Sequence, residues 1–395
     1  MLRHDSSNGG RGRARILVGG MFARVPGQGG LAWVVLHYML GLRRLGYDVI
    51  LVEPLGEVDL RPGGTGIAES ENARYFADVV HRFGIEAQAV LLLEGTRETV
   101  GLSYDRLQEA ARDADLLINM AGGLTDPDLL EPIPVRLYLD LDPGFTQLWH
   151  EVEGLDMNFD GHTHFATVGL TLGGPASTVP TCGIDWIPTP PPVVLDEWSF
   201  AQHVERDALT TVANWRGYGS IQVNGTFYGQ KAHSLRQFFD LPRRVDAGFQ
   251  LALAIDPGEP KDLAALAENG WQLVDPREAA ATPGAYRRFI QGSRAEFGIA
   301  KSGYVKARSG WFSDRSVCYL ASGRPVIAQE TGFSRVLPTG EGLLVFETAD
   351  QVVEAVDVLA ADYDRHRRAA RSIAEEAFAS EVVLPRLLSR VGIES

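Results

Sequence analysis

The chain has little cysteine and no long apolar run. Cys182 and Cys318 are the only thiols in 395 residues. Two thiols so far apart give neither a disulfide framework nor a zinc-ligand spacing, which favours a reducing compartment. No uninterrupted apolar stretch is long enough for a transmembrane helix, and no signal-peptide core follows the arginine-containing start. We therefore expect a cytoplasmic protein without a membrane span, in which residues 1–13 form a disordered lead-in.

Positive charge is also scarce. The chain carries 37 Lys and Arg against 51 Asp and Glu, a formal net charge of -14. A surface this acidic repels phosphate backbones, so we expect no nucleic-acid partner. A nucleotide is not excluded, because one small basic pocket can bind it. Hydrophobic residues make up 45% of the chain, which allows a large core without disulfides or metals.

Short apolar runs alternate with amphipathic segments, which is the pattern of a parallel sheet covered by helices on both faces. Proline is dense at residues 187–194, and because proline excludes a helix or a central strand this segment is expected to be a linker. The alternation restarts after it. The sequence therefore predicts an α/β protein with two doubly wound, Rossmann-like domains, residues 14–190 and 191–375. Ligands of such sheets bind beyond the carboxyl ends of the strands, so a cleft that excludes water is expected between the domains.

Residues 308–333 are the most informative segment. The run Tyr319-Leu-Ala-Ser-Gly-Arg-Pro-Val-Ile327 resembles the donor-binding motif of GT-B glycosyltransferases, with a helix followed by a small-Gly-x-Pro-Val-Ile strand. The resemblance implies two Rossmann-like domains facing a cleft, the first binding the acceptor and the second a nucleotide sugar. It further implies that the last helix, residues 376–395, packs back onto the first domain. A UDP- or dTDP-sugar is the expected co-substrate, with no other cofactor.

The start of the predicted helix has the chemistry of a diphosphate site. Its free N–H groups and positive dipole end suit phosphate, and serine is a favoured cap. Asp314 is expected to cap the helix or to orient Arg315. Lys301, Lys306 and Arg308 would neutralise the diphosphate, unless they are solvated surface bases. The resemblance places Glu330 and Thr331 on the sugar hydroxyls, and a plain polar turn is the alternative. The remaining predicted donor residues are Gly310, Trp311, Ser313, Ser316, Gly332, Asn214 and Trp215.

Retaining relatives carry two glutamates where this chain has Gly310 and Cys318, which favours an inverting transfer. An inverting enzyme needs a general base near the acceptor hydroxyl. Asp140 and Asp142 are candidates that share one strand face by the period of two, and Asp140 is equally well explained as a structural carboxylate. His162 and His164 are further candidates. Without a clear third ligand the two histidines do not predict a metal site.

The loop at residues 26–30 is rich in glycine but lacks the spacing of a dinucleotide fingerprint. In GT-B proteins this first loop lies in the cleft. We assign Gln28, Gly29 and Gly30 to close approach to the donor phosphates and acceptor, with a plain tight turn as the alternative.

The sequence therefore predicts a metal-independent glycosyltransferase of the hexosyltransferase type, acting on a small-molecule or glycan acceptor. A GT-B epimerase acting on the nucleotide sugar and a non-catalytic sugar-nucleotide-binding protein are the alternatives. The Arg, Ala and Gly content favours bacterial natural product biosynthesis or surface-polymer decoration. The oligomeric state is not readable from the sequence.

Overall fold

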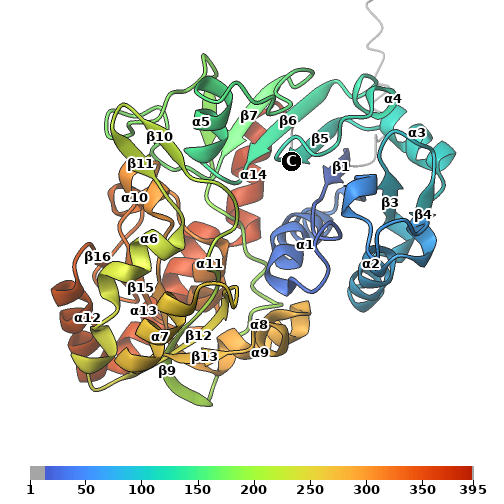
Figure 1. The fold of residues 1–395 in the computed structure, drawn as a ribbon. Helices are drawn as coiled ribbons and strands as arrows, with labels where there is room; N and C mark the ends of the chain where they lie inside the picture. The colour runs from blue at the N-terminus through green and yellow to red at the C-terminus, as the bar shows by residue number, and fades with distance from the viewer. Residues whose placement is uncertain (1–13, 394–395) are drawn as a thin grey trace, which may run out of the picture.

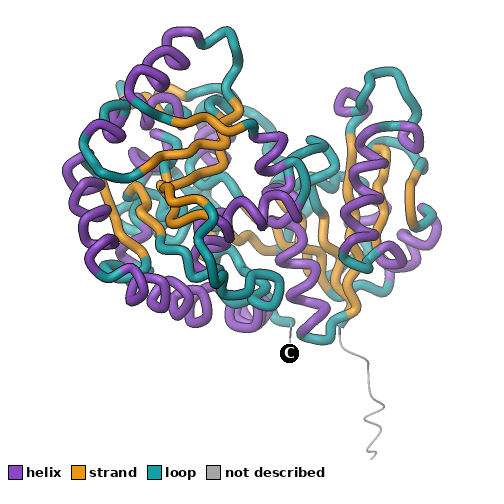
Figure 2. The backbone as a smooth tube through the Cα atoms, turned by 90° about the horizontal axis from the view of Figure 1, so that it is seen from below, coloured by secondary structure: helices purple, strands orange, loops and turns teal. Residues whose placement is uncertain are grey.

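The computed structural model describes residues 14–393, so the predicted lead-in at residues 1–13 lies outside the described residues. The chain forms two α/β bodies, each with a mainly parallel sheet inside and helices outside (Figures 1 and 2). We call them the first half, built on the sheet of residues 15–188, and the second half, built on the sheet of residues 206–346. The predicted α/β fold class is confirmed.

The first sheet has eight strands, and β3 pairs antiparallel with β4 while the other neighbours pair in parallel. In spatial order the strands are β4 (Thr99–Gly101), β3 (Ala89–Leu93), β2 (Asp48–Leu55), β1 (Arg15–Gly19), β5 (Leu116–Met120), β6 (Val135–Asp140), β7 (His164–Thr167) and β8 (Trp186–Pro188). The helices of this half are α1 (Gly29–Arg44), α2 (Glu71–Arg82), α3 (Tyr104–Arg112), α4 (Pro127–Leu130) and α5 (Phe145–Glu151).

The second sheet has six strands, all paired in parallel. In spatial order they are β13 (Gln272–Val274), β12 (Gly248–Ala254), β9 (Arg206–Asn214), β14 (Ser293–Gly298), β15 (Val326–Gln329) and β16 (Leu343–Phe346), with a separate hairpin of β10 (Ile221–Val223) and β11 (Thr226–Tyr228). The helices are α6 (Lys231–Leu235), α7 (Pro260–Asn269), α8 (Pro276–Ala280), α9 (Pro283–Gly292), α10 (Ser302–Ala307), α11 (Asp314–Ala321), α12 (Ala349–Ala361) and α13 (Tyr363–Ile373). The last helix, α14 (Ser380–Arg390), packs on α1 of the first half.

Both sheets have a point where the strand order reverses, between β1 and β5 in the first and between β9 and β14 in the second. At such a point neighbouring loops leave in opposite directions and open a crevice at the carboxyl ends of the strands. The residues that follow β1, β6, β9 and β14 are therefore the ones that the topology brings to the binding edge.

Helix α1 lies between the two sheets and joins their cores (Figure 1). Most of its residues are buried on all sides, as expected of a helix enclosed by protein rather than facing solvent. The Trp33 indole N–H donates to the Pro283 carbonyl at the start of α9, at 2.9 Å. A Cβ on Gly41 would lie 2.6 Å from Leu384 of α14 and 2.8 Å from Ser380. Helix α1 therefore packs tightly against both α9 and α14.

The proline-rich segment is not an open linker. Its first part forms β8, an edge strand, where proline is tolerated because no further strand needs its N–H. Val193 is fully buried, donates its N–H to the Phe378 carbonyl at 2.7 Å and accepts from the Ser380 N–H at 2.8 Å. The segment is thus fixed to the turn before α14, which the sequence pattern did not indicate.

Candidate active site

A cavity of about 450 Å³ lies where the two halves meet. Its wall includes Met21, which follows β1, Asp142, which follows β6, and Val168, which follows β7. From the second half come Asn214, at the end of β9, and Lys301, which follows β14. The cavity therefore lies at the carboxyl ends of both sheets, the position that the fold reserves for ligands.

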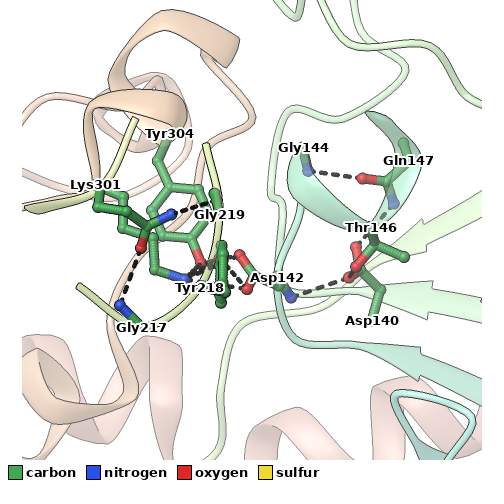
Figure 3. Close-up of polar contacts among 11 residues, drawn as sticks. Asp140, Asp142, Gly144, Thr146, Gln147, Gly217, Tyr218, Gly219, Lys301 and Tyr304 are labelled. Atoms are coloured by element: carbon green, nitrogen blue, oxygen red, sulfur yellow. Dashed lines mark hydrogen bonds and ion pairs between the residues drawn. The ribbon is translucent and has the colours of Figure 1, made fainter. Parts of the chain in front are cut away.

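Asp142 is the polar centre of this cavity (Figure 3). Its Oδ2 lies 3.1 Å from Lys301 Nζ, and its two oxygens also accept short hydrogen bonds from the hydroxyls of Tyr218 and Tyr304. Lys301 also donates to the Tyr218 hydroxyl. Burial lowers the pKa of Lys301, and the neighbouring Asp142 carboxylate acts against that shift. One carboxylate of the first half is thus held by three side chains of the second half.

Asp140 does not share the environment of Asp142. Strand β6 ends at Asp140, so the predicted alternation along one face does not continue to Asp142. Asp140 is fully buried and accepts from Thr146 Oγ1 at 2.7 Å, Gln147 Nε2 at 3.0 Å and Thr167 Oγ1 at 2.7 Å. It also accepts from the Asp142 N–H at 3.0 Å. Its oxygens therefore fix the loop that presents Asp142. Of the two roles predicted for Asp140, base and structural carboxylate, these contacts fit the structural one.

The two predicted histidines lie elsewhere. His164 begins β7, at the amino end of the strand, whereas the cavity is at the carboxyl ends. His162 packs edge-on against Tyr138, and its ring nitrogens lie 3.0 Å from Asn119 Nδ2 and 3.2 Å from the Phe159 carbonyl. Burial lowers the pKa of His162. Neither histidine lines the cavity, so their prediction as catalytic bases is wrong in position.

The amino end of α11 does face the cavity, through Phe312 and Asp314. Ser313 is the N-cap residue, but its side chain makes no capping hydrogen bond. Burial raises the pKa of Asp314, while the nearby cations Arg315 and Lys231 act against that shift. The helix start therefore offers its N–H groups beside a carboxylate.

Arg315 does not pair with Asp314, so the second of the two roles predicted for Asp314, orienting Arg315, is not observed. Its Nε lies 2.5 Å from Glu296 Oε1 on β14, and its Nη1 donates to the Val212 carbonyl on β9 at 3.1 Å. Since Arg315 follows Asp314 directly, the helical turn directs its side chain away from the cavity and onto the sheet. Ser316 is likewise buried within α11. Both residues support the helix rather than line the cavity.

Lys231, at the start of α6, is the cation that the sequence analysis missed. Its Nζ donates to the Ile299 carbonyl at 3.3 Å and lies 5.4 Å from the centre of the Trp311 ring. Burial lowers the pKa of Lys231 well below its ordinary value, and the cations Arg315 and Lys301 lower it further. Two lysines and an arginine thus gather near the start of α11. A lysine at the end of a glycine-rich polar loop was the available signal.

Arg308 and Glu330 lie together, but in a different cavity of about 320 Å³ that Gly332 also lines. Arg308 is exposed and its Nη2 lies 3.5 Å from Glu347 Oε1. The N–H of Gly332 donates to Glu330. Lys306 is exposed and donates to the Phe227 carbonyl of the β10–β11 hairpin at 2.8 Å. These four predicted donor residues therefore do not join the cavity at Asp142.

Gly310, Trp311 and Thr331 connect the halves. The Gly310 N–H donates to the Thr331 carbonyl at 2.8 Å, and its carbonyl accepts from the Leu170 N–H of the first half at 3.3 Å. A Cβ on Gly310 would lie 2.6 Å from the Thr171 nitrogen, so only glycine fits this approach. The Thr331 hydroxyl donates to the Trp311 carbonyl at 2.5 Å. The Trp311 ring lines the cavity.

Of the other predicted residues, one lines the cavity at Asp142 and the rest do not. Trp215 is buried and donates to Asp262 at 3.1 Å, away from the cavity, whereas its neighbour Asn214 lines it. Gln28 is the N-cap residue of α1 without a side-chain cap. A Cβ on Gly29 would lie 2.3 Å from the Thr282 backbone, and one on Gly30 would lie 2.9 Å from the Tyr286 ring. These glycines permit close approach to α9, not to a ligand, which corrects the prediction.

Within residues 14–393, no group of three or more His, Cys, Asp or Glu residues could hold a metal ion. In the same part of the chain, no helix is both long and apolar enough to cross a membrane.

Comparisons with known proteins agree with this arrangement. Residues 238–384 match the protein family described as glycosyl transferase-like. No curated protein sequence matches the chain. An α-glucosyltransferase in complex with UDP-glucose and DNA containing an abasic site is similar in structure, with 14% identity, 96% of this chain and 100% of that chain covered, and a TM-score of 0.61.

Two further solved structures are similar over nearly their whole length. HepE from Anabaena in complex with UDP-glucose is 10% identical, with 96% of this chain and 99% of that chain covered and a TM-score of 0.56. Sucrose-phosphate synthase from Thermosynechococcus elongatus is 11% identical, with the same coverage and a TM-score of 0.52. The chain is a protein of the GT-B glycosyltransferase fold, and its second half carries a glycosyl transferase-like domain.

Proposed function

We propose that this protein transfers a sugar from a UDP- or dTDP-sugar to an acceptor hydroxyl in the cavity between its halves. The observation that carries the proposal is the contact of Asp142 with Lys301 and Tyr304 at the carboxyl ends of both sheets, beside the start of α11. UDP is the first nucleotide to consider, because the similar structures of an α-glucosyltransferase and of HepE contain UDP-glucose.

The diphosphate would lie at the start of α11. There the free N–H groups of the first turn and the dipole favour an anion, and Lys231 and Lys301 supply compensating charge. A bound diphosphate would raise the pKa of both lysines towards their ordinary value, because it adds negative charge beside them. Asp314, in the cavity wall on this side, is placed to accept hydrogen bonds from donor-sugar hydroxyls.

Asp142 is the proposed general base. In the transfer the acceptor oxygen forms a bond to the anomeric carbon, the bond from that carbon to the diphosphate oxygen breaks, and the leaving diphosphate keeps the electron pair. The acceptor proton passes to Asp142. The carboxylate lies 3.1 Å from Lys301 Nζ, and the entering hydroxyl would replace one tyrosine hydroxyl as its hydrogen-bond donor.

The residues that replace the two glutamates of retaining relatives favour an inverting outcome. Gly310 has no side chain, and Cys318 is buried against His37, with its Sγ 3.6 Å from Nε2. Neither can act as a carboxylate. Inversion, transfer of a hexose, independence from a metal, a cytoplasmic location and a role in bacterial natural product biosynthesis remain predictions.

A thermal-shift screen tests the donor assignment. The purified protein is melted with UDP, dTDP and GDP and with their sugars, followed by an assay of nucleotide release with and without acceptor. A ligand at a hundredfold excess over its dissociation constant stabilises the folded state by about 2.7 kcal/mol. If no nucleotide raises the melting temperature, the transferase proposal fails. Conversion of the nucleotide sugar without acceptor would instead indicate an epimerase.

A further inference from the structure

The cavity at Asp142 has two unlike sides. On the side of the first half its wall is built from Met21, Leu31, Val34 and Met157, together with Pro191 and Pro192 of the proline-rich segment. The second half contributes the polar side chains of Asn214, Lys301 and Asp314. The first half adds the polar residues Asp142, Thr146, His37 and Tyr38. A nucleotide sugar needs the polar side, so the acceptor has the apolar wall available to it.

Two polar groups of the first-half wall, Thr146 and His37, are already engaged, whereas the buried hydroxyl of Tyr38 has no hydrogen-bond partner and leaves room for one ligand group. Thr146 donates its hydroxyl proton to Asp140 at 2.7 Å. His37 accepts from the Val194 N–H at 3.1 Å, and its other ring nitrogen faces Cys318. Burial lowers the pKa of His37 to about 3, so the ring is neutral. An acceptor with many hydroxyls would leave most of them without partners against this wall, at a cost for each buried group.

Aromatic rings surround the reactive end of the cavity. Trp149 packs edge-on against Tyr218 with ring centres 4.7 Å apart, and Tyr304 stacks on Trp311 at 4.4 Å. Trp149 and Trp311 are half-buried, so part of each ring stays accessible to a ligand. Such rings bind flat apolar groups well at little conformational cost.

The charges of the cavity argue against an anionic acceptor. Within the described chain, Lys301 is the one cation that lines this cavity, and it is paired with Asp142. Asp142 and Asp314 add negative charge. DNA or an acidic glycan needs several phosphates or carboxylates neutralised by free Lys or Arg, which this wall does not supply.

We propose that the acceptor is a neutral, mainly apolar small molecule with an aromatic or alicyclic ring and one hydroxyl that reaches Asp142. This inference rests on the proposed function, because it assigns the acceptor of the same transfer. The apolar wall holds the ring system, the aromatic residues orient it, and Asp142 receives the proton of its hydroxyl. A cavity of about 450 Å³ is within the ordinary range for binding a small molecule.

Isothermal titration calorimetry tests the proposal with 1-naphthol as the probe. Maltotriose and a short DNA duplex are titrated separately, as ligands of two other classes. The same protein samples are titrated with UDP. Met157→Gln places an amide on the apolar wall at a half-buried loop position, and Met157→Leu keeps the wall apolar. We expect 1-naphthol to bind the native protein and Met157→Leu alike, and Met157→Gln at least about tenfold more weakly. UDP affinity should be the same in all three.

Binding of maltotriose or DNA in place of 1-naphthol would overturn the inference. Equal binding of 1-naphthol to both variants would place its site elsewhere and also overturn it. Absence of UDP binding, with 1-naphthol still discriminating between the variants, would reject the proposed transferase and leave the apolar ligand site supported. The two ideas therefore fail separately.

Discussion

The boundary between the halves has two regions of opposite character. Along α1 it is apolar and closely packed, with Trp33 against Pro283 and glycines where the helices touch. At Asp142 it is polar, with a carboxylate from one half and a lysine and two tyrosines from the other around an open cavity. The first region can fix the position of the halves relative to each other. The second can therefore hold its charged side chains in a geometry suited to catalysis.

The two regions also differ in whether a ligand can substitute for their contacts. A ligand hydroxyl can take the place of a tyrosine hydroxyl at Asp142 without loss of hydrogen bonds. Nothing comparable can replace the dry contacts of α1, because packed apolar groups tolerate neither gaps nor added atoms. Loss of activity without loss of stability is thus expected at Asp142, and the reverse at α1.

The largest expected effect is that of Asp142→Asn on transfer. Removal of a general base lowers the rate by about 10²- to 10⁴-fold, and an amide cannot accept the proton. Initial rates at saturating donor measure this, with the melting temperature as a check on folding. The matched control is Asp160→Asn, at an exposed position outside the cavity, which should keep the native rate. A native rate in Asp142→Asn would remove Asp142 from the mechanism.

Next in size is the pH dependence that Glu53 gives to the loop before α1. Glu53 is fully buried and accepts from the N–H groups of Phe22 and Ala23, and burial raises its pKa from 4.5 to about 8. Because the pKa of Glu53 is higher in the folded than in the unfolded protein, protonation of Glu53 stabilises the folded state. Its contribution to stability is therefore complete below about pH 4.5 and is lost as the pH rises to about 8, by at most roughly 1.4 kcal/mol per pH unit.

Glu53→Gln should remove this slope. Denaturant unfolding at pH 5 and pH 8 should show a smaller loss of stability with rising pH in the variant than in the native protein. Glu98→Gln, at an exposed position, should leave the slope unchanged. Identical slopes for the native protein and Glu53→Gln would mean that Glu53 stays ionised in the fold.

A smaller effect is expected for Gly29→Ala, which adds one methyl group where α1 meets the Thr282 backbone. Backbone atoms cannot move aside as a flexible side chain can, so the free energy of unfolding should fall by about 1–3 kcal/mol. Gly63→Ala is the control, because no atom lies within 4 Å of its added Cβ. Chemical denaturation compares the two. Equal stabilities would mean that the contact between α1 and α9 is loose in solution.

The sequence predicted the elements better than the contacts between them. The apolar runs at residues 89–93 and 343–346 predict two of these elements and form β3 and β16, because continuous apolar runs between turn residues specify buried parallel strands. The start of α11 was also predicted, from its serine cap and the motif after it. These are local signals, and they need no knowledge of distant residues.

Contacts between distant residues could not be predicted in this way. Asp142 and Lys301 are 159 residues apart, and Arg315 pairs with Glu296 on a strand that lies behind its helix. The spacing of residues along the chain does not predict which of several basic side chains near the start of a helix will face a ligand. Arg308 was predicted and Lys231 was missed, and their different positions follow from the loops that carry them.

The affinity of the protein for UDP, compared between Lys231→Met and Arg308→Met by isothermal titration calorimetry, tests the central claim most directly. If the diphosphate binds in the cavity between the halves, Lys231→Met should weaken UDP binding by about tenfold or more and Arg308→Met should leave it near the native value. The opposite result would place the nucleotide in the cavity at Arg308 and Glu330 and contradict the account.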